Sequence, residues 1–128
     1  MFTNLTLFRA EFVGQRYLYT SVTQPDSSQC FDPNMCPREM PSSRFRILTD
    51  FAANPIIPKI QEMFRETGVD NGAVEFIFDA EGVARVVDVN TNTLYNTQAE
   101  VGAGTEEGWK AVVQYICTKL KEAEQVTQ

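Results

Sequence analysis

The sequence predicts an α+β fold in which two main helices pack on one face of an antiparallel β-sheet. Two pairs of segments rich in aromatic and β-branched residues are each joined by turn residues, as expected of β-hairpins. Two further segments repeat apolar residues at helical spacing. No internal repeat or low-complexity tract interrupts this order, so one sheet with its helices accounts for the chain.

The first half of the chain begins with a predicted hairpin. Residues 5–12 and 16–22 are its strands, and residues 13–15 supply the turn between them. Residues 24–43 hold four of the six prolines, which predicts a long ordered loop. Charged and apolar residues alternate over residues 44–48, which predicts a short, half-buried strand.

The second half contains both predicted helices and a second hairpin. A helix is expected over residues 56–67, where apolar residues recur at helical spacing before Gly68. Strands are expected over residues 73–78 and 83–89, joined by turn residues. A final helix opens after residues 105–107, and its apolar face is expected to pack against the sheet. That face comprises Trp109, Val112, Val113, Ile116, Cys117 and Leu120.

Charge and composition exclude several classes of function. Lysine and arginine number 11 against 17 acidic residues, and the net charge of −6 has the wrong sign for binding nucleic acid or an anionic membrane. The chain has no histidine and an odd number of cysteines, which argues against a zinc site and a disulfide framework. Cys30 and Cys36 are expected to pack within the loop. The amino terminus lacks a signal sequence, so a cytoplasmic location is expected.

The pairing of the second hairpin decides which of its side chains share a face. With a four-residue loop over residues 80–83, the polar face receives Glu75, Asp88 and Asn90. A three-residue loop would instead place Asp88 among phenylalanines, where an unpaired carboxylate is costly. The four-residue loop is therefore favoured, and it gathers an apolar surface for burial on the other face. That surface comprises Val74, Phe76, Phe78, Val87 and Val89.

The polar face of this hairpin predicts a metal site. Glu75 and Asp88 are expected to lie opposite or diagonal to each other, and like charges at such positions repel unless a cation lies between them. Two carboxylates with the Asn90 amide oxygen form a hard oxygen set that suits magnesium. An alternative stays open, in which the carboxylates line a solvated face and Asn90, Asn92 and Asn96 are turn formers.

Residues 74–79 followed by residues 86–93 resemble the end of the ATP-grasp ligases, within the C-terminal lobe that binds magnesium and phosphate. In that family an acidic residue on one strand and an acidic-x-Asn segment on the next bind the metal ions. The resemblance implies that Glu75, Asp88 and Asn90 are the ligands of Mg²⁺ or Mn²⁺.

Residues 7–19 are similar to the arginine-led hairpin of the same family, which implies that Arg9 faces the phosphates of ATP. Asn92 stands where some members place a phosphate-side arginine, and it is the second predicted cofactor-binding residue. Many members carry a further arginine where this chain has Ala73. The residue that replaces these arginines is left open.

The resemblance implies a single domain over residues 1–128, a partial ATP-grasp fold that consists of the C-terminal lobe without the ATP-binding N-terminal lobe. It implies a role in ATP-dependent carboxylate–amine ligation through an acylphosphate, with ATP and a small carboxylate as partners and little activity alone. The rival hypothesis is a non-catalytic α+β binding or dimerisation module, which would act as a homodimer through an exposed sheet edge.

Overall fold

The computed structural model describes residues 6–23 and 45–127. The predicted long loop, with Cys30 and Cys36, lies outside the described residues. In the described part of the chain, no helix is long and apolar enough to cross a membrane.

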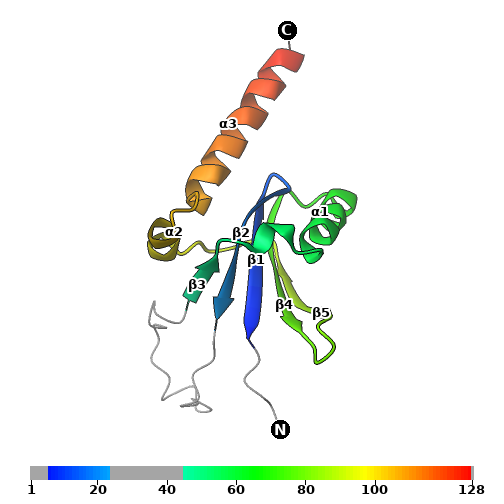
Figure 1. The fold of residues 1–128 in the computed structure, drawn as a ribbon. Helices are drawn as coiled ribbons and strands as arrows, with labels where there is room; N and C mark the ends of the chain where they lie inside the picture. The colour runs from blue at the N-terminus through cyan, green and yellow to red at the C-terminus, as the bar shows by residue number, and fades with distance from the viewer. Residues whose placement is uncertain (1–5, 24–44, 128) are drawn as a thin grey trace, which may run out of the picture.

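Five strands form one antiparallel sheet in the order β3-β2-β1-β4-β5 (Figure 1). The strands are β1 (Leu7–Val13), β2 (Arg16–Thr23), β3 (Phe45–Leu48), β4 (Asn71–Phe78) and β5 (Ala84–Asn90). Each lies within about two residues of its predicted position, and the predicted α+β class with an antiparallel sheet is confirmed.

Within residues 6–23 and 45–127, one 3-10 helix and three α-helices accompany the sheet. They are η2 (Phe51–Ala53), α1 (Ile56–Thr67), α2 (Thr97–Ala103) and α3 (Gly108–Val126). Helix α1 occupies the predicted residues and ends at Gly68, whose φ of 71° lets it cap the helix in the left-handed conformation. Helix α2 was not predicted, because its short segment is polar and contains glycine.

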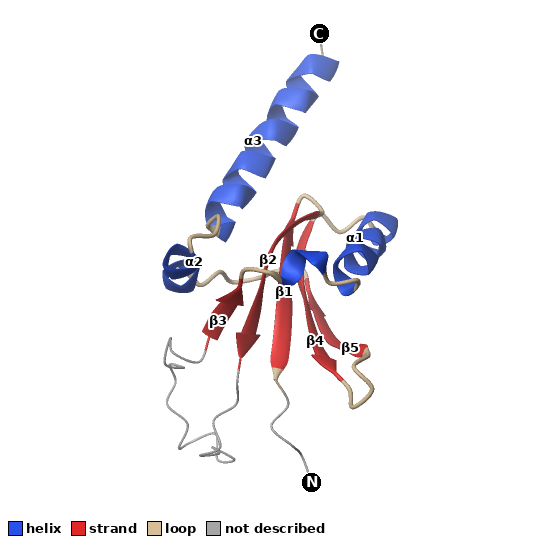
Figure 2. Ribbon diagram, in the orientation of Figure 1, coloured by secondary structure: helices blue, strands red, loops and turns tan. Residues whose placement is uncertain are grey.

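Helix α1 covers one face of the sheet and closes the hydrophobic core there (Figure 2). Alternate residues of β1 and β4 point to this face, and the rings of Phe12 and Phe64 meet edge to face with centroids 5.4 Å apart. The buried core comprises Ala10, Phe12, Ile56, Ile57, Ile60, Phe64, Val74 and Phe76.

The other two helices are placed differently from the prediction that helices share one face. Helix α2 contacts Tyr19, which pairs with Glu11 on the face opposite the core. In α3 only Gly108 and Ala111 are buried, while Trp109, Val113 and Ile116 are about half exposed. The predicted packing of the apolar face of this helix on the sheet is therefore wrong. The cause is geometric, because α3 runs beyond the end of the sheet (Figure 1).

The second hairpin combines a longer loop with a β-bulge. Phe78 pairs with Ala84, so five residues separate the two strands instead of the predicted four. The register then shifts between Glu75 and Phe76, which restores the predicted pairing of Glu75 with Asp88. The five-residue loop alone would place Asp88 on the face opposite Glu75. The one-residue bulge reverses this change, so both carboxylates lie on one face.

The apolar surface predicted for β5 is only partly buried. Val74 and Phe76 are buried in β4, but Val86, Val87 and Val89 are between 43% and 55% exposed. Strand β5 lies at the edge of the sheet, and the α1 helix does not cover these valines. The prediction that Val87 and Val89 lie under the helices is therefore wrong.

The turn at Gly14, between β1 and β2, packs against Tyr115 of α3. Gly14 has a φ of +58°, and a Cβ atom there would lie 2.6 Å from the ring of Tyr115. Gly14→Ala is expected to lose about 1–2 kcal/mol of folding free energy through backbone strain, plus the cost of displacing Tyr115. Urea unfolding measures this loss.

Gly82→Ala provides the matched control, since Gly82 has a φ of +77° and a Cβ atom added there would meet nothing within 4 Å. This variant is expected to show the strain cost alone. Equal losses in the two variants would show that the contact between Tyr115 and the turn contributes nothing.

Candidate functional site

A row of polar side chains crosses three strands on the face opposite the hydrophobic core. Arg9 in β1 pairs directly with Glu75 in β4, and Glu75 pairs directly with Asp88 in β5. Asn90 lies two residues beyond Asp88, so it projects to the same face. The structure therefore brings the predicted metal ligands and Arg9 together on one side of the sheet.

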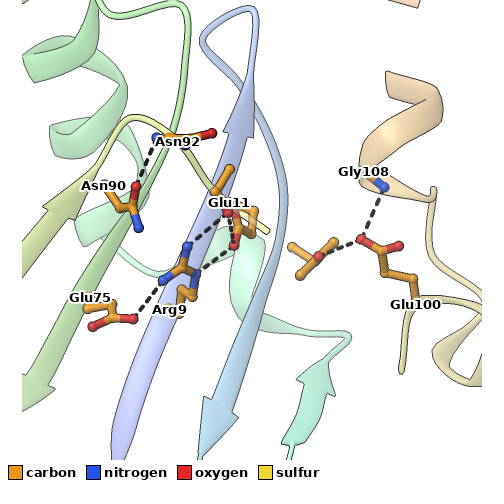
Figure 3. A network of polar contacts seen from close by, with 9 residues as sticks. Arg9, Glu11, Glu75, Asn90, Asn92, Glu100 and Gly108 are labelled. Carbon is orange, nitrogen blue, oxygen red and sulfur yellow. Dashed lines mark hydrogen bonds and ion pairs between the residues drawn. The ribbon is translucent and has the colours of Figure 1, made fainter. Parts of the chain in front are cut away.

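Arg9 is the centre of a hydrogen-bonded cluster (Figure 3). Its Nε donates to Glu11 Oε1 at 2.7 Å, and its Nη1 donates to Glu75 Oε1 at 2.7 Å. Its Nη2 donates to the hydroxyl of Thr93 at 2.8 Å, and this hydroxyl also approaches both oxygens of Glu11. Three donors of one guanidinium are thus fixed, which sets its orientation on the sheet.

Glu11 is the most buried member of this cluster, with a side chain only 2% exposed. Burial raises the pKa of the Glu11 carboxyl, and hydrogen bonds from Arg9 and Thr93 act against that rise. A carboxylate at this depth requires a cation beside it, because an unpaired buried charge is strongly unfavourable. Arg9 provides that cation.

The charges within the row formed by Arg9, Glu11, Glu75 and Asp88 do not balance. Its three carboxylates contribute three negative charges when ionised, and Arg9 contributes one positive charge, so these four residues carry a net charge of −2. A single divalent cation would neutralise this excess. The donor set therefore fits the predicted magnesium site in charge and in ligand type.

A cavity of about 620 Å³ opens beside the cluster, within the usual size range for small-ligand sites. Four of the five predicted site residues line it, namely Arg9, Glu75, Asn90 and Asn92. The lining also includes Leu7, Phe45, Leu94, Tyr95, Asn96 and neighbouring residues. Asp88 is not part of the lining.

A second cavity of about 470 Å³ lies between α1 and the turn of the second hairpin. Its lining is largely apolar, and Lys59 is the one ionisable side chain among the described residues that form it. The chemistry of the first cavity is richer, because carboxylate, guanidinium and amide groups converge there. We therefore place the candidate site at the polar cavity.

Asn90 and Asn92 also form a local turn, as the alternative interpretation expected. The Asn90 Oδ1 accepts a hydrogen bond from the backbone N–H of Asn92 at 2.8 Å. A carbonyl oxygen has a second lone pair, so this bond leaves one available for a cation.

Among the described residues, no group of three or more histidine, cysteine, aspartate or glutamate side chains could hold a metal ion.

Several residues that build the site were not predicted from the sequence. Glu11 was not singled out, although it lies two residues after Arg9 and therefore projects to the same face. Glu100 was also missed: it is fully buried, and its Oε1 accepts from the Tyr19 hydroxyl at 2.6 Å and from the Gly108 N–H at 3.0 Å (Figure 3). Its contacts join α2, α3 and the sheet, a link that only the tertiary structure reveals.

Tyr95 forms part of the cavity wall and packs tightly against the start of α3. A Cβ atom at Gly108 would lie 2.1 Å from the Tyr95 ring, so only glycine fits at this point. Burial, followed by the nearby Glu11 and Glu100 carboxylates, raises the pKa of Tyr95 to about 12. Tyr95 is therefore an uncharged wall residue at neutral pH.

Comparison with known proteins gives a structural likeness but no sequence relative. No protein-family model matches the chain, and a search of curated proteins finds no match. Among solved structures, the chain is similar to the macrocyclase MdnC from Microcystis aeruginosa MRC, solved with the precursor peptide MdnA, with a TM-score of 0.58 and 15% identity. The likeness covers 92% of this chain and 34% of the macrocyclase, so the chain spans about a third of that protein.

This comparison corrects the family assignment made from residues 74–79 and 86–93. At 15% identity the likeness shows a shared fold and nothing more. The identification of the chain as the C-terminal lobe of the ATP-grasp ligases is wrong, because no family model supports it and the structural likeness does not single out that lobe. The site must therefore be judged on its own geometry.

The pairing of Arg9 with Glu11 predicts a large effect of removing the cation. Arg9→Met is expected to destabilise the protein by about 3 kcal/mol, because it leaves the Glu11 carboxylate buried without a partner. Arg9→Met combined with Glu11→Leu should lose much less, since no charge is then stranded. Chemical denaturation of both variants provides the comparison.

Arg16→Met is the matched control for this series. Arg16 pairs with Glu106 at 2.9 Å, but its side chain is 56% exposed, so the variant is expected to lose about 1 kcal/mol or less. If Arg9→Met and Arg16→Met lost equally little free energy of unfolding, the Arg9 cluster would contribute no more to stability than a surface ion pair.

The raised pKa of Glu11 also predicts how the Arg9→Met defect depends on pH. A carboxyl whose pKa is higher in the folded chain than its ordinary value of 4.5 makes folding less favourable as pH rises above that value. Removing Arg9 raises the folded pKa further. The stability deficit of Arg9→Met should therefore be smaller at about pH 5 than at about pH 7. A deficit that is constant between these pH values would contradict this assignment.

Proposed function

We propose that the polar face of the sheet binds a divalent cation, Mg²⁺ or Mn²⁺, together with the phosphates of ATP. The main support is the direct pairing of Glu75 with Asp88 across β4 and β5. Two carboxylates held at facing positions repel each other, and a bound cation would turn this repulsion into a shared attraction. Asn90 on the same face supplies a neutral oxygen.

The two carboxylates have different roles in this proposal. Glu75 uses its Oε1 to accept from Arg9, so its Oε2 is the oxygen that would meet the cation. Asp88 makes no hydrogen bond or ion pair with any described residue, so both of its oxygens can serve. Asp88 is therefore the principal ligand, and Glu75 couples the cation to the Arg9 cluster.

Arg9 and Asn92 are the proposed phosphate-side residues. Arg9 lines the cavity with its guanidinium already held by Glu11, Glu75 and Thr93, so it offers a fixed positive charge beside an entering phosphate. Asn92 lines the same cavity and adds an uncharged donor and acceptor.

The proposed reaction is the joining of a carboxylate to an amine through an acylphosphate, with a further nucleotide-holding domain completing the site. The bound cation would offset the negative charge of the phosphates during phosphoryl transfer. The residues of this chain would hold and orient the phosphates, without acid–base chemistry. The macrocyclase neighbour was solved with a precursor peptide, so a peptide side-chain carboxylate is a candidate substrate.

Binding of Mn²⁺ tests this proposal without requiring activity. Free Mn²⁺ is followed by electron paramagnetic resonance during titration of the full chain, with and without ATP. The wild-type chain is expected to bind about one ion, and Asp88→Asn should weaken binding at least about tenfold, since a ligand charge is removed.

Glu81→Gln is the matched control, because Glu81 lies in the exposed turn of the same hairpin, away from the polar face. It removes one negative charge and should leave the affinity for Mn²⁺ unchanged. Equal weakening by Asp88→Asn and Glu81→Gln would show general electrostatic attraction and remove the site. Circular dichroism verifies that both variants fold.

A non-catalytic binding or dimerisation module is the second candidate function. The edge strand β5 favours it, because Val86, Val87 and Val89 are between 43% and 55% exposed beside an open row of backbone groups. A chain that fails to bind Mn²⁺ but associates through β5 would support this function. Val87→Lys would then abolish association.

A further inference from the structure

Helix α3 carries an apolar stripe that faces away from the sheet. Trp109, Val113, Ile116 and Leu120 are spaced by four, three and four residues, which is the alternating spacing of a two-helix seam. These four side chains are 49%, 51%, 49% and 60% exposed, respectively. Ala123 continues the stripe by a further step of three.

The sheet occupies a different side of the same helix. Gly108 and Ala111 are the buried residues of α3, and Tyr115 packs over the turn at Gly14. At 100° per residue these positions lie more than 90° around the helix from the centre of the stripe. Figure 1 shows the C-terminal half of α3 extending beyond the sheet. The stripe is therefore available to a partner without disturbing the contact with the sheet.

We propose that this stripe binds the same stripe of a second copy of the chain, with the two α3 helices antiparallel. Ile116 of each copy would then lie against Leu120 of the other, and Val113 against Ala123. The stripe is self-complementary around a two-fold axis that crosses it between Ile116 and Leu120, as an isologous dimer interface requires.

The charges beside the stripe favour the antiparallel orientation. Lys110 and Glu124 lie on the same side of the stripe, and the two-fold axis brings Lys110 of one copy beside Glu124 of the other, twice per dimer. Lys110 also pairs with Glu107 of its own helix, so it would be shared between the two carboxylates. In a parallel pair these residues would be about 21 Å apart along the axis, since 14 residues separate them at 1.5 Å each. A parallel pair would also bring both sheet domains to the same end, where they would compete for space.

The opposite flank is nearly neutral in this arrangement. Val112 of one copy would face Val126 of the other, which extends the apolar contact. The two Lys119 side chains would approach each other near the axis, but each already pairs with Glu122 of its own helix at 3.0 Å. The stripe spans only about two heptads, so we expect a weak dimer that forms with rising concentration.

Sedimentation equilibrium of the full chain over a range of concentrations tests this dimer. The wild-type chain should form dimers, while Ile116→Glu should stay monomeric and remain folded because its side chain is already half exposed. Lys110→Glu and Glu124→Lys should each weaken association about tenfold, and combining them should restore it. Lys121→Glu is the matched charge control, since Lys121 lies outside the seam and both flanks, and it should dimerise like the wild type.

Crosslinking at Cys117 tests the orientation independently. Cys117 is exposed and lies on the flank between Lys110 and Glu124, so the two copies of Cys117 face each other only in the antiparallel pair. A short bis-maleimide should give a covalent dimer in a Cys30→Ser, Cys36→Ser background and none when Cys117→Ser is added.

Each alternative outcome overturns the proposal. A chain that is monomeric at every concentration excludes the dimer, and a dimer that persists in Ile116→Glu assigns association to another surface. Failure of the double charge reversal to restore binding excludes the antiparallel register. None of these results depends on Mn²⁺ or ATP, so they are distinguishable from failure of the proposed metal site.

Discussion

The contact of Arg9 with Glu11 and Glu75 is the interaction on which the polar half of this structure depends. The sheet has one face closed by α1 and a second face that carries carboxylates, one of them 2% exposed. Such a face is tolerated only if a cation accompanies the buried charge. Arg9 provides it, and in doing so fixes Glu75 and Thr93 at the edge of the cavity. Stability and the candidate site therefore depend on the same guanidinium.

The bulge in the second hairpin is the structural condition for this arrangement. Near the turn, the pairing of Phe78 with Ala84 alone would continue into a register that places Asp88 on the apolar face. The one-residue shift after Phe76 returns Asp88 to the polar face opposite Glu75. It leaves Val87 as the extra residue at the sheet edge. An exposed valine is a small cost compared with a carboxylate buried among phenylalanines.

Much of the fold can be predicted from the local spacing of apolar and turn residues. Burial and tertiary contacts cannot be predicted from that spacing. Helix α1 lies where its periodicity and Gly68 placed it. Glu75 and Asp88 share the predicted face, but they do so through a bulge that the sequence pattern did not reveal. Glu11 was missed because a single acidic residue in a strand looks like surface until its burial is known. Helix α2 was missed because its seven residues carry no helical apolar pattern and depend on the buried Glu100 contacts, although its Asn96 cap is a local feature.

For helix α3, too, the sequence pattern predicts only part of what the structure shows. Its periodicity predicted an apolar face correctly, but a pattern along one helix defines a face and not the partner of that face. The sheet takes the side of Gly108 and Ala111, and the stripe from Trp109 to Leu120 is left exposed. The polar cavity and this stripe belong to different elements and share no residue. Cation binding and self-association should therefore be separable properties of one chain, each removable by a substitution that leaves the other intact.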